Sequence, residues 1–179
     1  MSNIDGYDEK KSIFIHLVSH SHMDVGWNMI PEDYYKTKVK SILNTVIDAL
    51  FDNEERKFSF AEIYYFEKWW NEQDEVQKDR VRRLVKEGRF EFVNGGWVAN
   101  DEACPTFEDI IINIMIGHSF LKREFGIQPR MAWHCDPFGH SATTPDLFAK
   151  MGFDALFFGR IDDEEKNWRK VNRSLEFIW

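Results

Sequence analysis

The sequence predicts an α/β protein in which helices cover a parallel sheet. Short runs of β-branched and aromatic residues alternate along the chain with longer segments that have helical periodicity. Several of the short runs are apolar on both faces, which is typical of strands in a sheet covered on both sides. Polar residues follow these runs directly, and parallel α/β folds place their functional sites at that end of the strands.

The first predicted strand covers residues 12–19, Ser-Ile-Phe-Ile-His-Leu-Val-Ser, which are mostly β-branched or apolar. A helix should follow over residues 32–50, because apolar side chains recur along one face at helical spacing. Those side chains are Val39, Ile42, Leu43, Val46, Ile47 and Leu50.

The middle of the chain predicts two further strands with helices between them. Residues 57–63, Lys-Phe-Ser-Phe-Ala-Glu-Ile, indicate the second strand, and the aromatic segment 64–70 begins a helix. Residues 75–86 are charged but place a few apolar side chains on one face, so they predict a solvated helix that Gly88 caps. Residues 89–93 are the third predicted strand.

A capping box predicts where the next helix begins, because Thr106 and Asp109 have the spacing of an N-cap and its partner. Gly126 and Pro129 end that helix. Residues 130–134 predict the fourth strand, residues 144–151 a helix, and residues 155–158 the fifth strand. Since strands and helices alternate throughout, the strands are expected to pair in parallel.

Polar residues that can do chemistry lie at the end of each predicted strand. His22 and Asp24 are two residues apart, so in extended chain they point the same way and could share one metal ion. Asp136 ends an apolar run, where a carboxylate is costly to bury without a metal or a cationic partner. Pro137 and Gly139 are expected to end the strand directly after it, and an aspartate that only makes a turn is the alternative. The full set is His22, Asp24, Glu62, Asp101, Glu102, Asp136 and Arg160.

The composition is that of a folded, acidic protein. The hydrophobic fraction is 43%, and the net charge of −8 argues against nucleic acid or an anionic membrane as a partner. Two cysteines do not make a disulfide framework. No apolar run is long enough to span a membrane, and residues 1–11 are expected to be a polar tail without the apolar core of a signal peptide.

Three motifs, in this order along the chain, resemble glycoside hydrolase family 38, the family of class II α-mannosidases. They are His-Ser-His-Met-Asp-Val-Gly-Trp at 20–27, Asn-Gly-Gly-Trp-Val-Ala-Asn-Asp-Glu-Ala at 94–103 and Trp-His-Cys-Asp-Pro-Phe-Gly-His-Ser at 133–141. The end of the second motif, and Phe-Phe-Gly-Arg at 157–160, are more similar to the lysosomal branch than to the Golgi branch. The resemblance covers nearly the whole chain and implies a lysosome or vacuole as the compartment.

The resemblance implies a zinc-dependent, retaining α-mannosidase. His22 and Asp24 match two zinc ligands, and Asp136 matches a residue that is both a zinc ligand and the catalytic nucleophile. Zinc held by nitrogen and carboxylate oxygen keeps open positions for sugar hydroxyls. A nucleophilic carboxylate implies a covalent intermediate and retention of configuration.

Three other matches concern the sugar. Trp27 matches an aromatic residue under the sugar ring, whereas Phe138 and Arg160 match pocket residues beside the nucleophile. The expected substrate is an α-mannoside such as an N-glycan, and the expected cofactor is Zn²⁺.

The same resemblance implies a fold larger than the five strands predicted here. The family's N-terminal domain is a seven-stranded β/α barrel, so residues 12–179 are expected to form the N-terminal portion of a catalytic domain, a partial parallel barrel of about five strands. The family's fourth zinc ligand, a histidine, and its acid/base carboxylate lie downstream of the matched region. We therefore expect an incomplete catalytic domain that is inactive alone.

Two other functions stay open. A non-catalytic remnant would keep only a weak metal or sugar site. A polysaccharide deacetylase, or another metal hydrolase, would also place histidine and aspartate at strand ends, although the Asp-Pro-Phe-Gly-His sequence at 136–140 argues against it. The sequence does not indicate an oligomeric state.

Overall fold

Parallel strands and helices alternate along the chain in the computed structural model, which describes residues 13–178. Strand β1 (Phe58–Phe60) pairs in parallel with β2 (Phe90–Phe92), and β3 (Met131–Phe138) pairs in parallel with β4 (Ala155–Arg160). The predicted α/β class with parallel strands is confirmed. The predicted tail at residues 1–11 lies outside the described residues.

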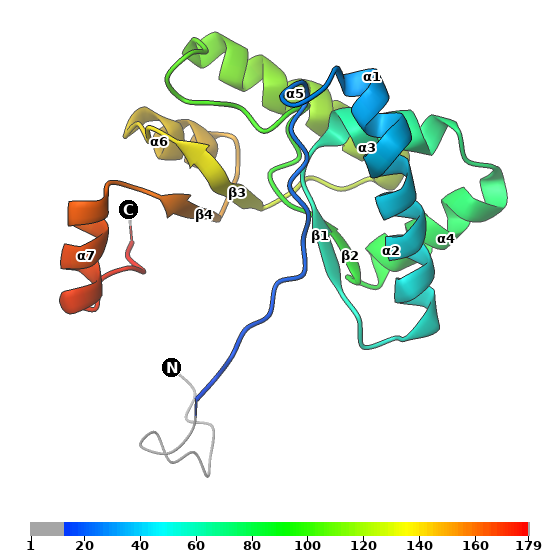
Figure 1. Cartoon of the computed structure of the whole chain (residues 1–179), viewed down its shortest axis with the longest axis horizontal. Coiled ribbons are helices and arrows are strands. Elements are labelled where there is room, and N and C mark those ends of the chain that lie inside the picture. The colour runs from blue at the N-terminus through cyan, green and yellow to red at the C-terminus, as the bar shows by residue number, and fades with distance from the viewer. Residues whose placement is uncertain (1–12, 179) are drawn as a thin grey trace.

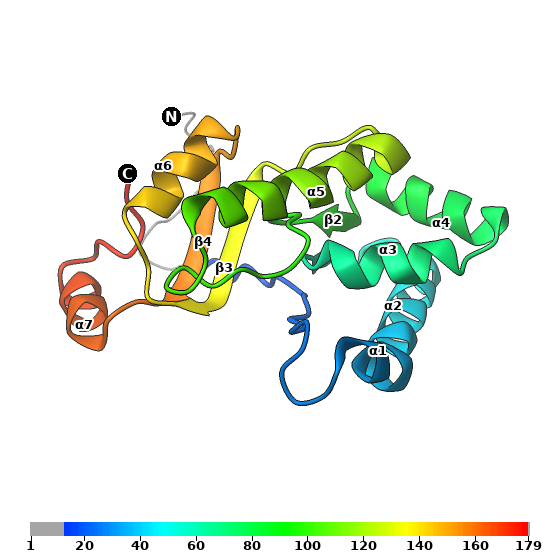
Figure 2. The same cartoon turned by 90° about the horizontal axis from the view of Figure 1, so that it is seen from above.

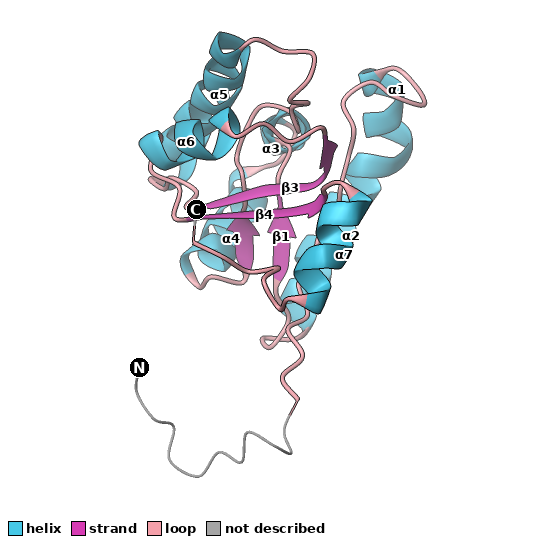
Figure 3. Ribbon diagram, turned by 90° about the vertical axis from the view of Figure 1, so that its left-hand side faces the viewer, coloured by secondary structure: helices cyan, strands magenta, loops and turns pink. Residues whose placement is uncertain are grey.

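The two strand pairs meet at Asn94, which directly follows β2. Its backbone N–H donates to the carbonyl of Met131 at 2.7 Å, and its side-chain oxygen accepts from the backbone N–H of Trp133 at 3.3 Å. Asn94 has a φ of +57°, so the chain turns sharply there instead of extending the ladder. In Figure 3 the β3–β4 pair accordingly runs at a steep angle to β1 and β2.

The strand predicted over residues 12–19 is wrong for the described residues 13–19. They form no ladder, and the only pairing is one parallel bridge between His20 and Ser59, beside which the Ser59 N–H donates to the Ser19 carbonyl at 2.8 Å. An apolar, β-branched run forms a strand only where a neighbour pairs with it, and β1 begins at Phe58, level with the end of this segment. Figure 1 shows the earlier residues leading away from β1, and Ile13 and Leu17 are exposed.

Strand β3 is longer than predicted. The sequence predicted a strand over residues 130–134 and a backbone break directly after Asp136, but β3 continues through Pro137 to Phe138. The pairing with β4 becomes irregular between His134 and Phe138, which is a bulge. A bulged residue needs no ladder hydrogen bond, so the missing N–H of proline costs little there.

Most helices begin and end close to the predicted positions. The helix predicted at 32–50 is continuous but has a π-helical turn in its first half, and the capping box of Thr106 and Asp109 forms as expected. The last helix was missed in the sequence. Within the described residues no helix is both long and apolar enough to cross a membrane. The helical elements are α1 (Pro31–Tyr34), η1 (Tyr35–Val39), α2 (Lys40–Asp52), α3 (Ile63–Asn71), α4 (Glu75–Lys86), α5 (Phe107–Phe125), α6 (Thr143–Lys150) and α7 (Asp163–Val171).

Two apolar clusters hold the elements together, and α5 takes part in both. Its first half packs Ile110 and Ile114 against β3 and α6, whereas Phe120 and Leu121 belong to the main core with α2, α3, α4, β1 and β2. Figure 2 shows α5 extending from α6 to the neighbourhood of α3 and α4. Fully burying one large apolar side chain contributes about 1.5–3 kcal/mol. The main core therefore anchors the segments that carry His22 and Glu62, and α5 connects them to β3, which carries Asp136.

Candidate metal and active site

The three residues predicted to bind metal lie together. His22 Nε2 is 3.0 Å from an Asp24 carboxylate oxygen and 3.2 Å from an Asp136 carboxylate oxygen. One ligand atom from each residue can be chosen so that all three lie within 4.8 Å of one another. The predicted convergence of these side chains is confirmed, while their binding of a metal stays a prediction.

The loop geometry explains why His22 and Asp24 face the same way. Met23, between them, is buried in the main core, so the two flanking side chains point to the opposite side. The Tyr65 hydroxyl donates to the backbone carbonyl of Asp24 at 2.9 Å and ties the loop to α3. Gly26 then turns the chain with a φ of +88°, a conformation that glycine adopts without strain.

A buried carboxylate lies behind His22. Glu62 precedes α3 directly, its side chain is 1% exposed, and one of its oxygens is 3.7 Å from His22 Nδ1. Burial disfavours the charged form and raises the pKa of Glu62 to about 7. With Nδ1 facing Glu62, the other ring nitrogen of His22 is directed toward the two aspartates. A carboxylate behind a histidine ligand is a common arrangement in metal sites.

Asp136 also has a cationic partner, which lies on the neighbouring strand. Arg160 Nη1 donates to the Asp136 carboxylate at 2.8 Å, and its guanidinium lies over the Phe138 ring, 4.9 Å from the centroid. The structure therefore brings together the two predicted pocket residues and the predicted nucleophile. Trp27 is 77% exposed in the loop before α1, and no ring contact or hydrogen bond within the described residues joins it to this group.

The donor set fits a divalent metal ion. Two carboxylates and one imidazole nitrogen converge, and within the described residues Arg160 is the one arginine or lysine that pairs with any of the three. Close carboxylates repel each other unless a cation lies between them. Imidazole and carboxylate suit zinc, although carboxylate-rich sites also accept other divalent ions. Three protein ligands leave coordination positions open for a substrate.

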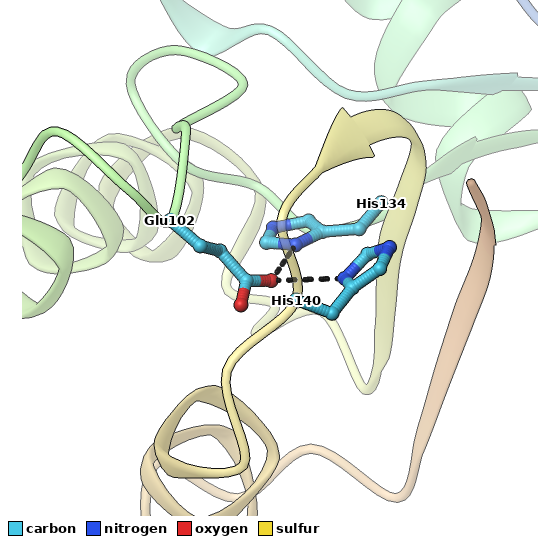
Figure 4. Close-up of side chains that lie close together, drawn as sticks. All are labelled: Glu102, His134 and His140. Atoms are coloured by element: carbon cyan, nitrogen blue, oxygen red, sulfur yellow. Dashed lines mark hydrogen bonds and ion pairs between the residues drawn. The ribbon is translucent and has the colours of Figure 1, made fainter. Parts of the chain in front are cut away.

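A second group of titratable side chains lies near the first and was not predicted as a site. Glu102, from the loop after β2, contacts His134 on β3 and His140 in the turn after it (Figure 4). The sequence placed Glu102 at a strand end, but nothing in its spacing connects it with two histidines more than thirty residues away.

Comparison with known proteins gives one family. Residues 12–179 match the family described as glycosyl hydrolases family 38 N-terminal domain. A lysosomal alpha-mannosidase from Cavia porcellus is 45% identical over 175 residues, and one from Dictyostelium discoideum is 42% identical over 173 residues. Each alignment covers 92% of this chain and 17% of the relative, so the chain spans about a sixth of the length of these proteins.

Solved structures agree on the fold. An alpha-mannosidase from Enterococcus faecalis V583 has a TM-score of 0.67 and 23% identity, covering 80% of this chain and 16% of that one. A 4-alpha-glucanotransferase from Thermococcus litoralis has a TM-score of 0.57 and 18% identity, covering 77% of this chain and 21% of that one. At such identities the likeness concerns the fold, which can carry different activities. The family match extends over nearly the whole length of this chain. The chain therefore belongs to glycosyl hydrolase family 38, whose N-terminal domain it matches.

Proposed function

We propose that this chain supplies the nucleophile and three metal ligands of a zinc-dependent, retaining α-mannosidase. The observation that carries the proposal is the convergence of His22, Asp24 and Asp136 at one point from two separate parts of the chain. The names of the relatives, which are alpha-mannosidases, support the choice of an α-mannoside as the substrate.

His22, Asp24 and Asp136 would hold the zinc ion. When bound, zinc would supply a Lewis acid that holds and orients hydroxyl groups of the sugar. The Asp136 carboxylate would form a bond to the anomeric carbon while the bond to the leaving oxygen breaks, and that oxygen would take a proton from a general acid. Water would then cleave the mannosyl–Asp136 ester and return the carboxylate.

Arg160 and Phe138 would act beside the nucleophile. The ion pair between Arg160 and Asp136 fixes the carboxylate in one orientation, which matters because reacting atoms must be aligned for attack. Phe138, which is half-exposed beneath the guanidinium, and the exposed ring of Trp27 offer apolar surfaces on which a sugar can stack.

The remaining features are proposed on the family resemblance. We infer that the parallel strands belong to a β/α barrel, that residues 12–179 are the N-terminal portion of a catalytic domain, and that N-glycans are the natural substrates. The fourth metal ligand and the general acid would come from outside this region, in keeping with relatives of which the chain spans 17%. A lysosomal compartment is proposed from the same relatives.

An activated mannosyl fluoride tests the nucleophile directly. Fluoride leaves with little need for protonation, so the substrate reduces dependence on a general acid. The chain is expected to be inactive alone on ordinary α-mannosides, which need the general acid. With zinc it is expected to release fluoride from this activated substrate and to gain the mass of one mannosyl group on the peptide that contains Asp136. The variant Asp136→Asn removes the nucleophile at nearly constant volume and should lose both signals.

The chain offers a matched control for this variant. Asp154 pairs with Arg130 at the amino ends of β3 and β4, just as Asp136 pairs with Arg160 near their carboxyl ends. Asp154→Asn therefore makes the same chemical change in the same type of ion pair, and it should leave fluoride release unchanged. Fluoride release that survives Asp136→Asn would remove the residue from the nucleophile role. Zinc binding without any release would favour the non-catalytic remnant.

A further inference from the structure

Glu102, His134 and His140 form a hydrogen-bond network centred on the Glu102 carboxylate, and the Nε2 atoms of both histidines are buried without a hydrogen-bond partner in the described structure. One Glu102 oxygen accepts from His134 Nδ1 at 3.0 Å and from His140 Nδ1 at 3.3 Å (Figure 4). The other Glu102 oxygen accepts from the Ser141 N–H at 2.6 Å. Glu102 and His134 are almost completely buried. A buried carboxylate is stable only when such donors replace the lost water, and here His134, His140 and Ser141 do so together with the Thr144 side chain.

The residues that contact Glu102 lie on both sides of Asp136 along the chain. His134 lies two residues before Asp136, and His140 and Ser141 lie four and five residues after it. The ladder between β3 and β4 is irregular within this interval, from His134 to Phe138. Regular strand pairing therefore does not fix the position of Asp136, whereas the contacts to Glu102 hold the chain on both sides of it.

Aromatic packing fixes the two histidine rings from outside the network. His134 contacts the Phe148 ring edge-on with centroids 5.2 Å apart, and His140 contacts the Phe158 ring at 5.2 Å. The imidazoles are thus held between a phenylalanine and the carboxylate, and neither can turn without breaking one of these contacts. These contacts restrain the chain at both ends of the bulged segment.

We propose that Glu102 is a positioning residue that holds the segment from His134 to Ser141 so that the Asp136 carboxylate reaches the metal site. This inference rests on the proposed function, because it takes His22, Asp24 and Asp136 as the metal ligands. Glu102 acts through the histidines and the Ser141 amide, and it contacts none of the three ligands in the described structure.

A second metal ion at Glu102, His134 and His140 is the competing interpretation. The contacts favour the network over a cation. Both Nδ1 atoms lie at hydrogen-bond distance from the same carboxylate oxygen, and the other oxygen already accepts from a backbone N–H. The two histidines therefore act as donors to the Glu102 carboxylate through Nδ1. Their Nε2 atoms are the nitrogens that a cation could still bind, so metal stoichiometry distinguishes the two interpretations.

The test uses zinc binding and amide exchange in the full chain with the variant Glu102→Gln. Zinc affinity is measured by competition with a chromophoric chelator, and hydrogen exchange of residues 134–141 is measured without metal by mass spectrometry. We expect one zinc per chain, a zinc affinity that is about 10- to 100-fold weaker in Glu102→Gln, and faster exchange of this segment in the variant.

Two control variants show whether the effects of Glu102→Gln arise from the loss of a negative charge or from general destabilisation, and not from lost positioning of residues 134–141. Asp79→Asn removes one negative charge from an exposed position on α4, and Val81→Ala removes buried volume from the same helix, far along the chain from the site. Both should retain the wild-type zinc affinity and the wild-type exchange of residues 134–141.

Each outcome decides the inference. Unchanged zinc affinity in Glu102→Gln, or an equal loss in Val81→Ala, would overturn it, as would two zinc ions in the wild type and one in Glu102→Gln. If the wild-type chain binds no zinc, the proposed metal site fails separately. The positioning role is then decided by exchange alone, which must be faster over residues 134–141 in Glu102→Gln than in Val81→Ala.

Discussion

The substitution Asp24→Asn should make the metal-free protein as stable as the wild type or more stable. In the presence of zinc the same substitution should make the protein less stable than the wild type. The ligand oxygens of Asp24 and Asp136 lie within 4.8 Å of each other, and in the described structure Arg160 pairs with Asp136 but not with Asp24. Without metal the two carboxylates repel each other, and Asp24→Asn removes that repulsion. With metal, the same variant loses a ligand.

The geometry sets the magnitude of the repulsion between Asp24 and Asp136. Two unit charges at this separation repel by about 1 kcal/mol in water and about 3–4 kcal/mol at an effective dielectric constant of 20. The side chains are 38% and 47% exposed, so the lower value applies. The amide oxygen of asparagine can still accept from His22, and the metal-free variant should be up to about 1 kcal/mol more stable than the wild type.

Thermal unfolding measures this reversal. For a domain of this size 1 kcal/mol corresponds to about 2–4 °C in Tm. In chelator the variant should unfold at an equal or higher temperature than the wild type. At a free zinc concentration of 100 times Kd the wild type gains about 2.7 kcal/mol, and it should then unfold at the higher temperature.

If Asp24→Asn lowers Tm in chelator and zinc raises Tm equally in both proteins, then Asp24 neither repels Asp136 nor binds the metal. The Asp154→Asn variant serves as the control, because it also converts an aspartate to an asparagine and should respond to zinc as the wild type does.

Three further predictions concern the network and the scaffold. Burial would raise the pKa of Glu102, but hydrogen bonds from His134 and the Ser141 amide outweigh it and lower the pKa from 4.5 to about 2. The ionised Glu102 should therefore stabilise the fold by about 3 kcal/mol above pH 4.5, and this contribution should be lost as the pH falls toward 2. Acid titration of Glu102→Gln should lack this pH dependence of the free energy of unfolding. Trp69→Ala in the main core should lower the free energy of unfolding by about 3–5 kcal/mol in denaturant titration. Thr106→Ala at the start of α5 should cost about 0.5–2 kcal/mol in the same experiment.

The sequence predicted the fold class from local patterns, whereas the resemblance to the family implied the metal-type cluster. The His-x-Asp spacing explains why His22 and Asp24 point to one side, but that Asp136 joins them followed from the matching motifs and not from local spacing. The capping box at Thr106 is encoded within four residues.

The errors concern features that depend on distant parts of the chain. Residues 13–19 have strand composition, but whether they pair depends on where β1 begins. The bulge that lets β3 continue through Pro137 depends on its register with β4. The role of Glu102 depends on the loop after β2 meeting β3, and no local spacing contains that contact. Helix α7 had a local signal, an N-cap at Asp162 with acidic residues in the first turn and basic residues in the last, and it could have been found.

If His22, Asp24 and Asp136 together hold zinc, crystals of the full chain grown with zinc should show the ion between them. Diffraction data collected on both sides of the zinc absorption edge locate the metal without assumptions about its ligands. We expect one anomalous peak about 2.0–2.2 Å from a His22 ring nitrogen and from carboxylate oxygens of Asp24 and Asp136. No peak there, or a peak between Glu102, His134 and His140 alone, would contradict it.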